Sequence, residues 1–289
     1  MIKRLIFAPV IWSSLLLIVA QVITLFIVSR EQVFVEVNNF PSPQIGLGIP
    51  VLYFFGAVIV IGLALFFIPI SILRLLLLIL FAFIFAWGIF ILLLMSFYLP
   101  VLLSGIIAVI AGIIWYFKPI IWLHNLLLLL ALISVGLVFG YLLSPWAAML
   151  LLLVIAVYDF VSVRLGHMMW MAQKLSESNV LPAFVIPISI TKWNFNLKKS
   201  GFKNLFEERT EREFSLLGGG DVGFPLLLVV SVFFLSGYAA AIIIAAFSLV
   251  GLIGAYWVQS FFFKGKPTPA MPSISLACLI GFLITYYLL

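Results

Sequence analysis

Two aspartates, Asp159 and Asp221, lie in strongly apolar stretches of this 289-residue chain, and they are the only acidic residues that do. A charged side chain at the centre of a bilayer costs about 2.5–3.5 kcal/mol, so an ionisable residue there is expected to have a function. Two carboxyl groups that share a site cannot both ionise easily, so one of them keeps its proton. One group can then deprotonate a water molecule while the other polarises a carbonyl, which is the chemistry of peptide hydrolysis.

Few other residues could support a different catalytic chemistry. The single cysteine, Cys278, excludes an internal disulfide framework and a cysteine metal cluster, and the only histidines are His124 and His167. An aspartate pair needs one water molecule and no covalent nucleophile. We therefore expect neither a cofactor nor a metal.

The aspartate pair alone leaves other functions open. Paired intramembrane acids also occur in proton-coupled transporters, and a single aspartate can simply hydrogen-bond a neighbouring helix. A non-enzymatic proton- or ion-conducting protein would need polar residues that continue across the membrane. After Asp221 the next clearly polar residue is Ser231, so the chain offers little of such a path.

The composition shows which elements must position the two aspartates. The chain is 66% hydrophobic and 8% charged, whereas soluble domains carry roughly 25% charged residues. Apolar runs of about 20 residues, the length that spans a bilayer as a helix, recur along the chain. We predict an all-α polytopic membrane protein whose residues 1–289 form one membrane-embedded domain. Its nine transmembrane helices are expected at about 5–28, 48–70, 75–97, 101–117, 120–143, 146–163, 216–235, 238–261 and 268–289.

The basic residues predict an orientation. With a cytoplasmic N-terminus and an external C-terminus, 14 of the 15 lysines and arginines fall on the cytoplasmic side, and only Arg30 does not. The long connection at about 164–215 is then a cytoplasmic loop. Its basic and aromatic stretch at 198–206 is expected to lie on anionic lipid headgroups, and no nucleic-acid partner is expected.

The two aspartates are expected at similar depth in adjacent antiparallel helices. Asp159 is five residues before Arg164, and Asp221 is eight residues after Glu213. At 1.5 Å per residue both lie about 7–12 Å inside the cytoplasmic boundary. Asp159 is near a helix C-terminus and Asp221 near a helix N-terminus, where negative charge is favoured. This predicts Asp221 as the ionised base and Asp159 as the protonated acid.

Three short motifs surround the aspartates. Tyr158 precedes Asp159, the glycines Gly218, Gly219 and Gly220 precede Asp221, and the last helix opens with Pro269, Ala270 and Met271. Together, on these helices, the motifs resemble those of the presenilin and signal peptide peptidase family of intramembrane aspartyl proteases. The family's third motif is Pro-Ala-Leu, and Met271 replaces its leucine with a similar volume. The short loops resemble those of a compact archaeal homologue in a prokaryotic cell membrane.

The resemblance implies a function. Asp159 and Asp221 would be catalytic, and single-span membrane proteins or peptides would be cut within or near their transmembrane segments. The glycines would let the helix at 146–163 or a substrate backbone approach Asp221. The proline segment would pair with an unwound substrate, although proline is also common at the start of a helix. Tyr158 would bind substrate or lie at the membrane interface. Prepilin-type peptidases also use Gly-x-Gly-Asp, but they lack the proline motif.

Three polar residues outside these motifs are expected to form hydrogen bonds between helices. They are Gln21, His124 and Asn125.

Overall fold

The computed structural model describes most of the chain. The described ranges are 2–38, 45–167, 170–171, 174–175, 182–197, 214–261 and 268–288. The predicted lipid-binding stretch at 198–206 lies outside these ranges. The chain forms two compact units. The first comprises residues 1–13, 56–134 and 166–219, and the second comprises 14–55, 135–165 and 220–289.

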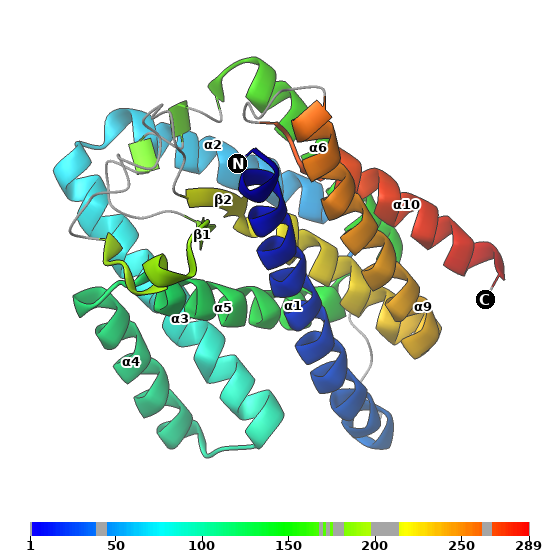
Figure 1. The fold of residues 1–289 in the computed structure, drawn as a ribbon. Helices are drawn as coiled ribbons and strands as arrows, with labels where there is room; N and C mark the ends of the chain where they lie inside the picture. Colours follow the sequence, from blue (N-terminus) through cyan, green and yellow to red (C-terminus); the bar gives the residue numbers. More distant parts are fainter. Residues whose placement is uncertain are drawn as a thin grey trace. The chain divides into compact units, whose positions relative to one another are not determined.

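Long apolar helices dominate the described residues, as Figure 1 shows. Six are long and apolar enough to cross a membrane: α1 (Ile2–Asn38), α2 (Ile49–Phe67), α3 (Ile70–Phe97), α5 (Ile121–Leu142), α6 (Pro145–Arg164) and α9 (Gly219–Phe261). Two shorter apolar helices are α4 (Val101–Phe117) and α10 (Met271–Leu288). The chain is therefore a polytopic membrane protein. The number of crossings and the sides of the termini stay predictions.

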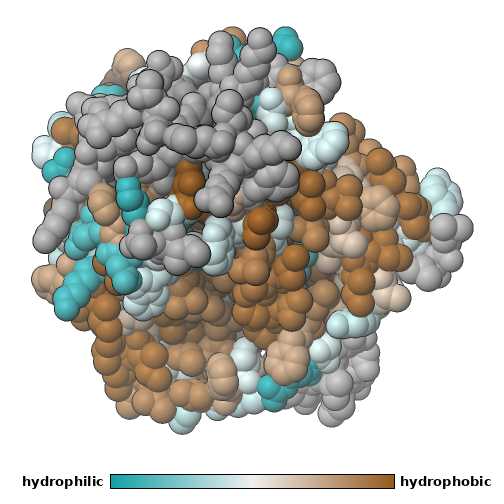
Figure 2. All heavy atoms as spheres, viewed as in Figure 1, coloured by the Kyte–Doolittle hydropathy of each residue, from teal (hydrophilic) through white to brown (hydrophobic). Residues whose placement is uncertain are grey.

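The outer surfaces of these helices are suited to lipid. Leu102 is 77% exposed and Phe66 is 72% exposed, which would be costly in water. On the face drawn in Figure 2, hydrophobic side chains cover most of the described helical surface. Hydrocarbon is the solvent that such a surface requires.

One non-helical residue interrupts α9. Gly237 has φ 83° and ψ −175°, a positive-φ conformation that residues with a Cβ rarely adopt. The sequence predicted a break between helices at Ser236 and Gly237, and the backbone departs from helical geometry at the second of these residues.

The first unit contains a helical hairpin packed through small residues. A Cβ on Gly112 of α4 would lie 3.1 Å from the carbonyl oxygen of Ala82 in α3. A Cβ on Gly88 of α3 would lie 2.6 Å from Cα of Ala131 in α5. The Ser134 hydroxyl, also in α5, donates to the Gly88 carbonyl at 2.7 Å. Close approach of small residues, with a hydrogen bond across the contact, is the usual way helices associate in lipid.

A two-stranded antiparallel sheet in the first unit corrects two predictions. Strand β1 (Ala183–Pro187) pairs with β2 (Phe214–Gly218), and a short 3₁₀ helix, η1 (Ile190–Asn194), follows β1. The fold is mostly helical but contains one small sheet that the sequence did not predict, and the connection at 164–215 is not only a loop. The helix expected at 216–235 begins at Gly219, because the residues before it pair with β1. The sequence did not predict these strands, because five residues are too few to show a clear alternation of apolar and polar side chains. The two strands also lie far apart in the sequence.

The second unit packs α6, α9, α10 and part of α1 together. Gln21 of α1 donates to the Ala245 carbonyl at 3.2 Å and to the Ser248 hydroxyl at 2.6 Å, which confirms the predicted hydrogen bond between helices. The Ser275 hydroxyl of α10 donates to the Leu152 carbonyl of α6 at 3.1 Å. This last contact aligns α10 with the helix that carries Asp159.

Candidate active site

Asp159 lies in the last turns of α6 and is only 8% exposed. Ser144 caps the start of this helix by accepting from the Ala147 N–H at 3.2 Å, and Pro145 follows at the first turn. The Oδ2 atom of Asp159 accepts from the main-chain N–H of Met271 at 3.2 Å. The Ala270 main chain also hydrogen-bonds this carboxyl group.

These bonds give the proline motif a structural role. The first N–H groups of a helix have no partner within it, and α10 begins at Met271. The Asp159 side chain supplies that partner from another helix, as an N-cap residue would. The segment Pro269 to Met271 thus lies beside Asp159.

Asp221 lies in the first turn of α9 and is partly exposed. Two residues, Gly219 and Gly220, separate it from the end of β2 at Gly218. Asp221 therefore follows the end of a strand by three positions along the chain.

One aromatic ring links the two aspartate-bearing segments within the second unit. Phe54 of α2 makes edge contacts with Tyr158, at 5.5 Å between ring centroids, and with Phe224, at 6.4 Å. Tyr158 is next to Asp159, and Phe224 is one helical turn after Asp221. The same ring therefore contacts both segments. Sequence reasoning missed Phe54 and Phe224, because each is one phenylalanine among many in apolar helices.

The Tyr158 hydroxyl is a buried polar atom beside the candidate site. It has no hydrogen bond within the described part of the chain. A buried hydroxyl that lacks a partner costs free energy, so a donor or acceptor from a bound molecule would be favourable here.

The three glycines occupy three different environments. Gly218 is the last residue of β2, opposite Ala183, which corrects its predicted place in a helix. The Gly219 N–H donates to the Pro182 carbonyl at 3.0 Å, and a Cβ at this position would lie 3.0 Å from the same oxygen. A Cβ on Gly220 would lie 3.1 Å from Cε2 of Phe224. The last two glycines thus permit close contacts within the protein itself.

His124 and Asn125 bind a strand rather than a helix, contrary to expectation. Asn125 makes two hydrogen bonds to the main chain of Val185, and His124 bonds the carbonyl of Ala183. The sequence could not show this, because the strand itself was not predicted.

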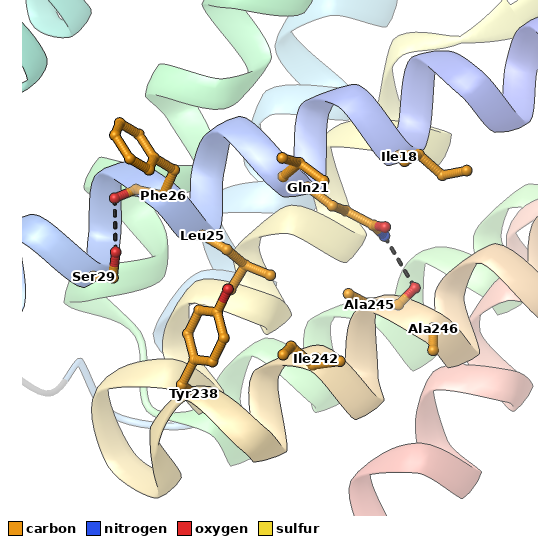
Figure 3. A pocket seen from close by; sticks show the side chains of 10 residues that line it. Ile18, Gln21, Leu25, Phe26, Ser29, Tyr238, Ile242, Ala245 and Ala246 are labelled. Atoms are coloured by element: carbon orange, nitrogen blue, oxygen red, sulfur yellow. Dashed lines mark hydrogen bonds between the residues drawn. The ribbon is translucent and has the colours of Figure 1, made fainter.

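A groove elsewhere in the second unit contains none of the predicted site residues. It has a volume of about 680 Å³ and lies between α1 and the part of α9 after Gly237 (Figure 3). Gln21 points across it towards Ala245, and Tyr238 and Phe26 lie near one end. We do not assign the groove to the aspartate site.

Comparisons with known proteins agree on one family. The family described as "Signal-peptide peptidase, presenilin aspartyl protease" matches residues 14–288. A solved structure of a presenilin family intramembrane aspartate protease, in space group C222, is 22% identical, with a TM-score of 0.61 over 97% of this chain and 100% of that one. A second, in space group P2, is 21% identical, with a TM-score of 0.59 over 96% of each chain. None of the curated proteins matches this chain.

Proposed function

We propose that Asp159 and Asp221 are the catalytic pair of this chain, which belongs to the signal-peptide peptidase and presenilin family of intramembrane aspartyl proteases. The observation that carries the proposal is the shared contact of Phe54 with Tyr158 and Phe224. It draws together the segments that hold the two carboxyl groups. Between them, one water molecule would be deprotonated and would attack the substrate carbonyl.

The pair would work with one shared proton. The dipoles of α6 and α9 favour the ionised form at Asp221, as the sequence predicted. The N-terminus of α10, however, donates an N–H to Asp159 and favours the ionised form there as well. These effects oppose each other, so the proton belongs to the pair rather than to one residue.

The substrates would be single-span membrane proteins or peptides that unwind before cleavage. A helix engages its own carbonyls in hydrogen bonds, so water reaches a peptide bond only when the segment becomes extended. β2 pairs with β1 along one edge, and in the described residues no strand pairs with its other edge. An extended substrate can add to that edge.

The membrane topology completes the proposal. We count α9 as two crossings divided at Gly237, and the shorter α4 and α10 as one crossing each. Nine crossings would put the two termini on opposite sides of the membrane, with the N-terminus in the cytoplasm and the C-terminus outside in our proposal. The basic residues then satisfy the positive-inside rule.

The test is cleavage of a single-span substrate by the purified protein in liposomes. D159A and D221A should each abolish product formation, since neither aspartate can replace the pair. The control is S231A, which removes a buried hydroxyl that donates to the Leu228 carbonyl in the same helix, α9, as Asp221. S231A should retain cleavage. Product formation by either aspartate variant at the wild-type rate would disprove the catalytic pair.

A further inference from the structure

Within the second unit, the start of α10 packs closely against α9 at a glycine. A Cβ on Gly251 would lie 2.6 Å from Cα of Ile274 and 2.9 Å from the carbonyl oxygen of Ser273. Both are main-chain atoms in the first turn of α10, which begins at Met271. Main-chain atoms in a packed interior cannot rotate away as the end of a long side chain can. A side chain at position 251 would therefore force one of the two helices to move.

The same turn of α10 carries the N–H that binds Asp159. The Met271 N–H donates to Oδ2 of Asp159 at 3.2 Å, the long end of the usual range for such bonds. Moving the added Cβ from 2.6 Å to 3.0 Å, below which real Cβ contacts essentially do not occur, requires a shift of at least 0.4 Å. The same shift away from Asp159 would stretch the bond from 3.2 Å to 3.6 Å, which is too long for a hydrogen bond.

A third helix holds α9 in place, so α10 is the helix that we expect to move. Gln21 of α1 donates to the Ala245 carbonyl at 3.2 Å and to the Ser248 hydroxyl at 2.6 Å, and Ser248 is three residues before Gly251. Gln21 is 5% exposed, so these bonds are shielded from solvent. Within one turn of the contact with α10, α9 is therefore fixed to α1.

A movement of α10 would also change how it meets α6. Besides the Met271 N–H, the Ser275 hydroxyl of α10 bonds the Leu152 carbonyl of α6 at 3.1 Å. A hydroxyl can rotate to follow its acceptor, whereas a main-chain N–H is fixed by the helix that contains it. The bond to Asp159 is therefore the more sensitive of the two.

A second glycine makes a similar contact far from Asp159. A Cβ on Gly281 of α10 would lie 2.9 Å from Cβ of Phe247 in α9. Gly281 is ten residues after Met271, which is about 15 Å along the helix. The two glycines thus join the same pair of helices at different distances from the aspartate. A purely structural role of such contacts predicts similar effects at both positions.

We propose that Gly251 is a positioning residue, whose missing side chain lets α10 take the place from which the Met271 N–H reaches Asp159. This rests on the function proposed above, in which Asp159 is catalytic. A hydrogen bond to a carboxylate both stabilises its charge and fixes its orientation. A catalytic group that is misplaced by 1 Å can lose about 100-fold in rate. Gly251 therefore affects the reaction without touching the substrate.

The first experiment compares kcat and KM of wild type, G251A and G281A on one single-span substrate in liposomes. We expect kcat to fall about tenfold in G251A with KM within about twofold, because the bound substrate meets a misplaced carboxyl group. G281A is the matched control, since it adds the same methyl group between the same two helices. It should keep kcat within about twofold of wild type. Equal losses in both variants, or no loss in G251A, would overturn the proposal.

A double-mutant cycle separates positioning from lost stability. M271P removes the N–H through which Gly251 is proposed to act. In the M271P background, G251A should therefore lower kcat by less than about twofold. In the M271A background the N–H remains, and G251A should again cost about tenfold. Multiplying losses in the M271P background would show that Gly251 does not act through this bond.

Amide hydrogen exchange reports on the bond without any cleavage. Exchange at Met271 should become at least about tenfold faster in G251A and stay at the wild-type rate in G281A. Should G251A fail to fold, Q21L replaces it, because it removes both bonds that fix α9 near Gly251. Q21L should lower kcat about threefold, and this loss should disappear in the M271P background. A loss that persists there would count against the proposal.

The outcomes separate this inference from the proposed function. Inactive D159A together with wild-type kcat and wild-type Met271 exchange in G251A refutes only the role of Gly251. Cleavage by D159A at the wild-type rate refutes the proposed function and, with it, this inference.

Discussion

Asp159 lies in the last turns of a helix and accepts a hydrogen bond from Met271, which lies 112 positions further along the chain, whereas Asp221 lies in the first turn of a helix that directly follows a strand in the sequence. The first environment depends on how α6 and α10 pack. The second depends on how β2 changes into α9. The difference teaches that the two halves of the proposed catalytic pair can be disturbed separately, by long-range changes at one and local changes at the other.

The substitution expected to disturb the environment of Asp159 most is M271P. Proline is tolerated in the first turn of a helix but removes the N–H that Asp159 accepts. A hydrogen bond to a charged group contributes about 1.5–3 kcal/mol, so cleavage should fall about 10- to 100-fold. M271A controls for the lost side chain in the same kcat measurement. Equal activity of M271P and M271A would show that the N–H is not needed.

The Asp221 side is tested by G219A. The added Cβ would lie 3.0 Å from the Pro182 oxygen, and relief of such overpacking costs about 1–3 kcal/mol. We expect about a tenfold loss of cleavage and a lower melting temperature. A Cβ on Gly254, later in α9, would have nothing within 4 Å, so G254A is the matched control and should keep full activity. If both alanines behave alike, close approach at Gly219 does not position Asp221.

F54L changes the ring that contacts both the Asp159 segment and the Asp221 segment. It keeps an apolar side chain but removes the edge contacts to Tyr158 and Phe224, which are worth about 0.5–1.5 kcal/mol each. Cleavage should fall about 2- to 10-fold. The double-mutant cycle with F224L then tests whether the contact to the Asp221 segment is responsible. Fully additive effects in the cycle would argue against a coupling through this ring.

The smallest effect is expected for M271L. Leucine and methionine are close in volume, and such exchanges usually cost less than about 1.5 kcal/mol. The main-chain N–H to Asp159 remains, so cleavage should stay within about twofold of wild type. This variant also restores the residue of the family's Pro-Ala-Leu motif. A large loss in the same kinetic assay would mean that the shape of the Met271 side chain contributes to the site.

The sequence alone determined the solvent and the chemistry. Long apolar runs require lipid, and lipid makes each buried acid costly enough to stand out, so Asp159 and Asp221 could be proposed as the catalytic pair without a structure. The break in α9 was equally visible, because glycine is the residue that adopts a positive φ without strain, and Gly237 does so.

Only the tertiary structure decided what surrounds the two aspartates. The pairing of β1 with β2 joins five-residue segments that are far apart in sequence, and short strands carry too little alternation to be recognised. The Met271 N–H, the Phe54 ring and the Asn125 side chain act through contacts with distant residues. Such contacts depend on how helices pack, and helix packing in lipid follows shape rather than the hydrophobic pattern that a sequence displays.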